Sequence, residues 1–135
     1  MAEWGDDLVT RLTAQGVGVY GTTIFLSSKA VIPTTGTVMQ IHTTGGVEGE
    51  RTHNSAPGLS AERPWAQLEV KGTTHGAAMT MWRAAFNALS TVTNLTINST
   101  SYRLIRALQS APIDLGLDPQ GRIRYAFNVR GERNT

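Results

Sequence analysis

An apolar stripe in the second half of the sequence places the strongest constraint on the fold. Apolar side chains recur there at intervals of three and four residues, the spacing of one face of an α-helix: Ala78, Met81, Trp82, Ala85, Phe86 and Leu89. Thr73 or Thr74 supplies a hydroxyl suited to capping the N-terminus of this helix. A helix with one apolar stripe must bury it against another element, so we expect Trp82 and Phe86 to be buried against a sheet.

Segments with alternating side chains supply that sheet. Apolar and polar residues alternate in residues 65–71 and again in residues 122–130, which is typical of strands with one buried face. Shorter strands are expected at 22–27, 38–43, 95–97 and 102–108, with a polar turn at 98–100, and a first helix is expected over residues 3–15. This order predicts a single α+β domain over residues 1–135, with a mainly antiparallel sheet and two helices packed on one face.

Composition excludes several classes of function. The chain has 135 residues and no cysteine, which excludes disulfides, zinc–thiolate sites and thiol nucleophiles. Its net charge of +2 is too small to identify a nucleic-acid-binding protein. The three histidines are far apart, and the Gly-x-Gly-x-x-Gly string at 16–21 follows a predicted helix, where a dinucleotide site needs a strand. We therefore expect a non-catalytic protein that holds no cofactor and no metal.

The surface and the first residues indicate where such a protein works. Only 16% of the residues are charged, compared with about 25% in a typical soluble domain, which suggests that part of the surface is covered in an assembly. The first residues lack a basic segment followed by an apolar one, and no apolar run is long enough for a membrane span. We expect a protein that is made and kept in the cytoplasm and has no membrane partner.

Residues 44–64 interrupt the succession of short strands. About 20 residues without a recognisable element is long for a loop in a small domain, and such loops are usually functional. Because its glycines, prolines and polar residues cannot form a core, we expect this loop to be mobile in the free subunit and ordered on assembly. Its charged residues and histidine are candidate contacts with a neighbouring subunit or partner: Glu48, Glu50, Arg51, His53, Glu62 and Arg63.

The C-terminal third is the most basic part of the chain. Arg122, Arg124 and Arg130 fall on one side of the alternating strand at 122–130. Guanidinium groups on one face suit phosphates or carboxylates, so these three arginines are candidates for a surface that faces DNA in a lumen. The alternative is an exposed sheet face kept soluble by arginine. No aromatic residue alternates with them on that side of the strand, so any contact with nucleic acid would not depend on base sequence.

Three segments together resemble a known family. They are residues 50–54 (Glu-Arg-Thr-His-Asn), residues 62–67 (Glu-Arg-Pro-x-Ala-Gln) and residues 114–129, which contain Asp-Leu-Gly-Leu-Asp and Tyr-x-Phe-Asn-Val. With these segments the whole chain resembles the small phage proteins described as minor capsid or tail-completion proteins. That group is similar to the tail terminators of long, non-contractile-tailed phages.

The resemblance implies a tail-terminator-like fold and a structural role in the virion. Tail terminators of this type form a ring, a hexamer by resemblance, that caps the tail tube, stops its polymerisation and offers a surface to the head. The implied partners are copies of the chain itself, the tail tube protein, a head–tail connector or head-completion protein, and passing DNA without sequence specificity. The implied location is the tail or neck of the virion after assembly in the host cytoplasm. A head-side neck or head-completion protein is the alternative, and a small enzyme or cofactor-binding domain is a third.

Overall fold

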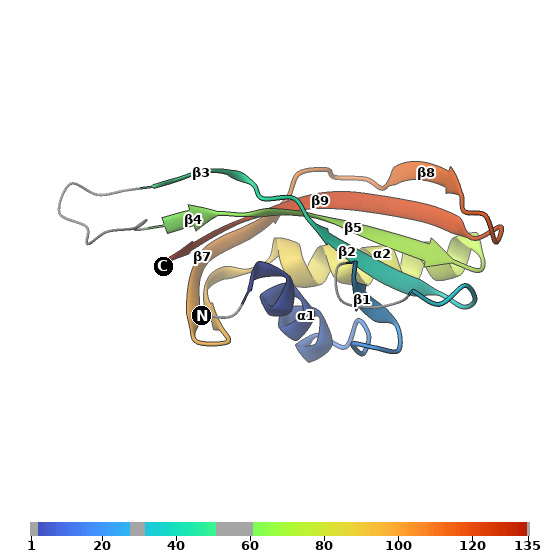
Figure 1. Ribbon diagram of the computed structural model, residues 1–135, viewed down its shortest axis with the longest axis horizontal. Helices are drawn as coiled ribbons and strands as arrows, with labels where there is room; N and C mark the ends of the chain where they lie inside the picture. Colours follow the sequence, from blue (N-terminus) through green and yellow to red (C-terminus); the bar gives the residue numbers. More distant parts are fainter. Residues whose placement is uncertain (1–2, 28–31, 51–60, 135) are drawn as a thin grey trace.

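The computed structural model describes residues 3–27, 32–50 and 61–134, with the backbone alone for residues 47–50. Its described part is one α+β domain: a mixed, mostly antiparallel sheet with two helices packed against one face (Figure 1). The helices are α1 (Trp4–Ala14) and α2 (His75–Ser90). The strands are β1 (Ile24–Leu26), β2 (Val38–Thr43), β3 (Val47–Glu50), β4 (Ala61–Arg63), β5 (Trp65–Gly72), β6 (Thr93–Ile97), β7 (Thr100–Ala107), β8 (Ile113–Leu117) and β9 (Ile123–Asn134). The predicted fold class is thus confirmed.

The long strand β9 is the centre of the sheet. It pairs with β5 and β4 along one edge and with β8 and β7 along the other, always antiparallel. Beyond β5 lies β2, and β1 pairs with β2 in parallel; β3 lies beyond β4, and β6 beyond β7. Within the described residues β1–β2 is the one parallel strand pair, which makes the sheet mixed rather than fully antiparallel.

The apolar stripe of α2 packs on the middle of the sheet. The helix begins after Thr74, whose side-chain oxygen accepts a hydrogen bond from the Ala77 amide at 3.1 Å. Trp82 is fully buried, and its indole N–H donates to the Ala126 carbonyl oxygen at 3.1 Å. Phe86 stacks on Trp82 but is only partly buried, so the expectation that both are buried holds for Trp82 and is too strong for Phe86.

The helix α1 lies beside α2 on the same face of the sheet (Figure 1). Leu8 and Leu12 are fully buried, and the Arg11 Nε donates to the Ala88 carbonyl oxygen of α2 at 3.0 Å. Trp4 lies over the backbone of Gly131 in β9, where an added Cβ atom would lie 2.7 Å from the indole ring. A side chain at position 131 would therefore displace the start of α1. Neither helix is long and apolar enough to cross a membrane, as far as the described residues go.

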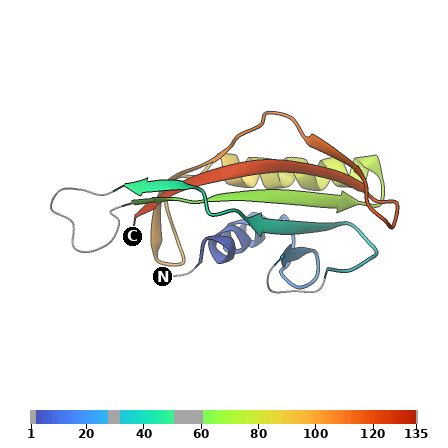
Figure 2. The same cartoon turned by 45° about the horizontal axis from the view of Figure 1, so that its top comes forward.

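The segment 44–64 is not a loop throughout, which corrects the sequence prediction. Its backbone contains β3 and β4, an antiparallel strand pair that follows on from β2 and leads into β5 (Figure 2). We call this pair the arm; β4 also pairs with β9, which joins the arm to the sheet. Gly46 sits at the start of the arm with a φ of 93°, and a Cβ atom there would lie 2.1 Å from the Arg63 carbonyl oxygen. Residues 51–60, about half of the segment expected to be mobile, lie outside the described residues.

The strand β8 was not expected from the sequence. It pairs with β9 alone, contributes no residue to the buried core, and carries a bulge at Gly116, whose φ is 78°. The Asp114 side chain accepts a hydrogen bond from the Gly116 amide at 2.8 Å, which satisfies a backbone donor at the bulge. A bulged edge strand of this kind lacks the alternation that reveals a buried one.

Candidate interaction surfaces

The side of the sheet opposite the helices is polar, and we call it the open face. On β2, β5 and β9 it carries the residues that alternate with those facing the helices: Val38, Gln40, His42, Trp65, Gln67, Glu69, Lys71, Arg124, Ala126, Asn128, Arg130 and Glu132, of which Val38 and Ala126 are buried. Arg124 and Arg130 share this face, as the alternation predicts. Arg130 comes six positions after Arg124 along β9, which corresponds to a distance of about 20 Å between them. The charge is thus spread along the strand.

Arg122 does not belong to the open face. It is 5% exposed, and its Nε donates to the Asp118 carboxylate at 2.7 Å while its Nη1 donates to the Gly36 carbonyl oxygen at 3.3 Å. Burial raises the pKa of Asp118, but hydrogen bonds from the Arg122 amide and guanidinium, together with its charge, hold that pKa below its usual value. Arg122 thus fastens the β8–β9 turn to the chain before β2, and alternation alone could not distinguish this from exposure.

A nearly buried carboxylate stands at the middle of the open face. Glu69 is 8% exposed; one of its oxygens lies 3.3 Å from His42 Nε2 and the other 3.8 Å from Arg124 Nη1. The hydrogen bond from His42 and the nearby charges of Lys71 and Arg124 lower the pKa of Glu69, against the opposing effect of burial. Lys71, Arg124 and Arg130 outnumber Glu69 and Glu132, and Glu132 is itself paired with Arg63 at 3.5 Å, so the open face of these three strands keeps a net positive charge.

An aromatic side chain does accompany the arginines, although the sequence of β9 alone gave no sign of it. Trp65 of β5 pairs directly with Arg130 of β9, so the indole and the exposed guanidinium share the open face. The Trp65 Nε1 atom is buried, and the described residues supply no hydrogen-bond partner for it. The pairing of β5 with β9 was needed to find this neighbour.

Ion pairs within the chain fix the base of the arm. Glu62 accepts from the Nε and Nη2 atoms of Arg133, both at 2.8 Å, and Arg63 lies 3.5 Å from Glu132. Glu62 and Arg63 are therefore bound to β9 of their own subunit. Glu48 and Glu50 lie on β3, where only the backbone is described, and Arg51 and His53 lie outside the described residues.

A buried polar network links the two ends of the described chain, and sequence reasoning missed it. Asp7 of α1 is fully buried; its carboxylate accepts hydrogen bonds from the Tyr102 hydroxyl and from Asn98 Nδ2 at 3.0 Å, and it lies 3.5 Å from Arg133 Nη1. Burial and the hydrogen bond to Asp7 raise the pKa of Tyr102 well above its usual range. Asp7 and Arg133 are 126 residues apart, so no local pattern could have paired them.

The two described histidines lie apart from each other. His75, the first residue of α2, shares a 2.8 Å hydrogen bond with the Tyr125 hydroxyl, while His42 pairs with Glu69 on the other face of the sheet. In the described ranges, no three histidine, aspartate or glutamate residues lie close enough to hold a metal ion.

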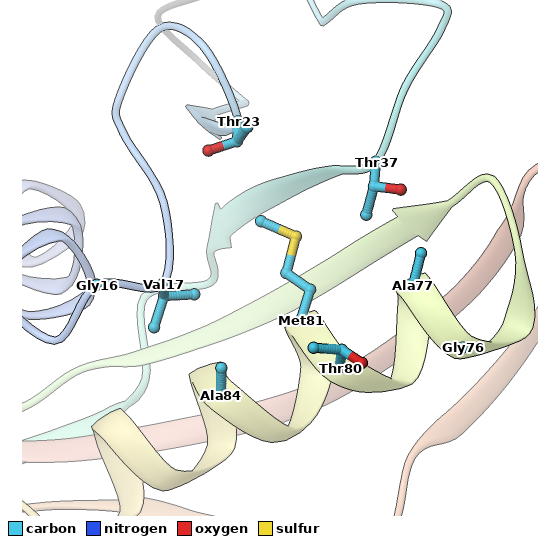
Figure 3. Close-up of a pocket in the computed structure, with 9 residues that line it drawn as sticks. All are labelled: Gly16, Val17, Thr23, Thr37, Gly76, Ala77, Thr80, Met81 and Ala84. Carbon is cyan, nitrogen blue, oxygen red and sulfur yellow. The ribbon is translucent and has the colours of Figure 1, made fainter.

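A hollow opens on the helix-bearing side, between α2 and the chain that leads from α1 to β1 and β2. It measures about 460 Å³ and is lined by Gly16, Val17, Thr23, Thr37, Gly76, Ala77, Thr80, Met81 and Ala84. Figure 3 shows the Met81 side chain extending from α2 toward the space between Val17, Thr23 and Thr37. Alanine, valine and methionine dominate its walls, and threonine supplies the polar atoms. The hollow therefore suits an apolar group.

Comparison with known proteins adds no relative to this description. No protein-family profile matches the chain, and no curated protein sequence is significantly similar to it.

Proposed function

We propose that this protein is a structural virion protein, a tail terminator whose subunits form a ring on the end of a phage tail tube. The ring stops tube polymerisation and provides the surface to which the head connector attaches. The open face carries the proposal: apart from the buried side chains of Phe25, Val38 and Ala126, it is a polar sheet surface with net positive charge.

The physical demands of a DNA passage match this face. A passage must attract phosphate without holding any one sequence, which a dilute and salt-screened positive surface achieves. Arg124 and Arg130 are spread along β9, and Glu69 partly neutralises Arg124, so the attraction is weak at each point. Both helices lie on the other side of the sheet, so neither covers this face (Figure 1). Arg124 also donates from Nη2 to the Leu115 carbonyl oxygen of β8 at 2.7 Å.

The arm supplies the second supporting feature. Its base is held by the Glu62–Arg133 and Arg63–Glu132 pairs, so β3 and β4 extend from the body in a fixed direction. Glu62 and Arg63 serve as anchors within the subunit, and the proposed contacts with the tube or a neighbouring subunit fall to Glu48, Glu50, Arg51 and His53. A virion location in the tail or neck follows from the same proposal.

Tube capping tests the proposal directly. The tail tube protein of the same phage is polymerised with and without the purified chain, and tube lengths and ends are measured by electron microscopy. A terminator shortens the tubes and places a ring at one end. Tubes of unchanged length, with rings that bind only the head connector, would instead identify a head-side neck protein.

A charge-removal pair tests the assignment of the open face. The double variant Arg124→Gln with Arg130→Gln should still cap tubes, but virions that carry it should retain or eject DNA poorly. Arg83→Gln, on the helix-bearing side, removes a charge without touching the open face and serves as the control. If the double variant blocks ring formation instead, the two arginines lie in a subunit interface and not in the channel.

A further inference from the structure

We infer that the ring closes by a head-to-tail contact in which Leu117 of one subunit enters the hollow beside α2 of the next. The inference rests on the proposed function, because it names the surfaces through which the proposed ring would form. The partner is a second copy of this chain.

The exposed apolar side chains point to these two surfaces. In the described part of the chain, the large hydrophobic residues with exposed side chains are Val19, Tyr20, Leu108 and Leu117. Leu117 is the most exposed of them at 65%, and it ends the edge strand β8. Val19 is 58% exposed and Tyr20 is 40% exposed, and both lie between the lining residues Val17 and Thr23 of the hollow. One edge of the domain thus carries an apolar knob and another carries an apolar cavity.

The strand register places the knob and the hollow on one row of the sheet. Leu117 pairs with Ile123, which pairs with Gly72, and the next position across the sheet is Thr37, whose hydroxyl bonds the Thr73 amide. Thr37 lines the hollow, so the row runs from Leu117 at the β8 edge to the hollow at the β2 edge. The two surfaces therefore stand at the same height along the strands.

The knob and the hollow also lie on the same side of the sheet. Gly72, in the Leu117 row, faces α2, because a Cβ atom there would lie 2.5 Å from Ala78. Paired residues in neighbouring strands point to the same side, so Leu117 points to the helix-bearing side, where the hollow opens. The open face takes no part in the contact and stays available for the channel.

This arrangement has the geometry of a ring. The two surfaces differ from each other, so the contact is heterologous, and a heterologous contact closes if repeated rotation returns to the first subunit. The knob and the hollow lie at the same height along the strands. A rotation about an axis parallel to the strands can therefore bring the knob of one subunit to the hollow of the next without a shift along that axis. A shift would produce a helical filament rather than a cap. Because β8 adds nothing to the core, it is free to bind a neighbour.

Two matched pairs of variants test the contact. Leu117→Glu places a charge on the knob, and Ala84→Glu places one at the exposed rim of the hollow; neither residue belongs to the buried core. The controls are Leu108→Glu, an exposed leucine level with Asn128 and about 17 Å along the strand from the row, and Asn87→Glu, exposed on α2 outside the hollow. Mass is measured by size-exclusion chromatography with light scattering over a concentration series, and circular dichroism checks folding.

The single variants should separate cleanly. We expect Leu117→Glu and Ala84→Glu to weaken self-association by about 10- to 100-fold or more and to leave single subunits of 14.5 kDa. Both control variants should keep the wild-type mass. A ring of unchanged mass in either knob or hollow variant overturns the inference and leaves the proposed ring intact. A wild-type chain that stays monomeric up to its solubility limit also overturns it, and tube capping then decides separately on the proposed function.

Mixing the two variants tests whether the knob of one subunit binds the hollow of another, while the wild-type mass distinguishes a closed ring from a two-fold dimer. Leu117→Glu keeps an intact hollow and Ala84→Glu keeps an intact knob, so the mixture has one working contact for each pair of subunits. We expect a 1:1 heterodimer that grows no further, whereas each variant alone stays monomeric. A mixture that stays monomeric, or that assembles into full rings, contradicts the knob-and-hollow contact.

Discussion

Replacing Asp7 by alanine removes the centre of the buried network between α1 and β9. The carboxylate is fully buried and has three partners: the Tyr102 hydroxyl, Asn98 Nδ2 at 3.0 Å and Arg133 Nη1 at 3.5 Å. Asp7→Ala removes a carboxylate from beside Arg133, which is 8% exposed and keeps its contact with Glu62. The variant also leaves the Tyr102 hydroxyl without its acceptor. We therefore expect a large loss of stability.

The size of that loss follows from the type of contact. Removing the acceptor of a buried donor costs about 1–3 kcal/mol, and Asp7→Ala removes the acceptor of both the Tyr102 hydroxyl and Asn98 Nδ2. With the lost contact to Arg133, which keeps Glu62, the total is about 3–5 kcal/mol. The free energy of unfolding of a natural domain is about 5–15 kcal/mol, so this change removes a large share of it. In a domain of this size the midpoint of thermal unfolding should fall by roughly 10–20 °C.

Urea unfolding followed by tryptophan fluorescence measures the effect. Asp6→Ala is the matched control, because it removes a carboxylate from the same helical turn, outside the buried core, and should cost at most about 1 kcal/mol. A double-mutant cycle with Tyr102→Phe should give a coupling energy of about 0.5–3 kcal/mol with Asp7→Ala. If Asp7→Ala costs no more than the Asp6 control, the network does not hold α1 to the sheet and the reasoning is refuted.

Three further predictions concern the core and pH. Trp82→Ala should cost about 3–5 kcal/mol in urea unfolding, and Phe86→Ala roughly half of that, because Phe86 is only partly buried; equal costs would contradict the packing of α2. The pKa of Tyr102 is raised in the folded state, so its contribution to stability is complete below the ordinary value of 10.0 and is lost as pH rises above it. The free energy of unfolding of the wild type, measured against pH, should therefore fall more steeply above pH 10.0. That of Tyr102→Phe should fall less steeply. The pKa of Glu69 is lowered, so its contribution to stability is present above the ordinary value of 4.5 and is lost as pH falls through the folded-state value. Glu69→Gln should therefore make the free energy of unfolding depend less on pH in the acid range. An unchanged pH dependence would exclude this role.

Patterns of burial made most of the fold predictable. The stripe of α2 and the alternation in β5 and β9 come from elements with one buried face, and the structure places them where the sequence did. The expected turn at 98–100 is present, and Asn98 and Ser99 adopt the positive φ values that a tight hairpin needs. A periodic apolar pattern survives in such elements because the core requires it.

Elements and contacts that the core does not shape could not be predicted in this way. The strands β3 and β4 are short and lie at one end of the sheet, and β8 is a bulged edge, so none of them carries a clear alternation. Arg122 looks like its neighbours in sequence, yet the Asp118 carboxylate in the preceding turn draws it into a buried pair. The Asp7–Arg133 contact and the Leu117 row depend on strand pairings that appear only in three dimensions.

The position of β9 in the sheet has a consequence for biosynthesis. A ribosome completes the other eight described strands before it completes β9, yet β9 holds β4, β5, β7 and β8 together. Until β9 emerges, the chain can form its helices and the β2–β5 and β6–β7 pairs, but it cannot close a sheet over them. Folding must therefore wait for contacts that are distant in sequence, which slows it and leaves apolar strands exposed on the nascent chain. A chain released before β9 should neither fold nor take a place in an assembly, so incomplete products would be excluded without a separate check.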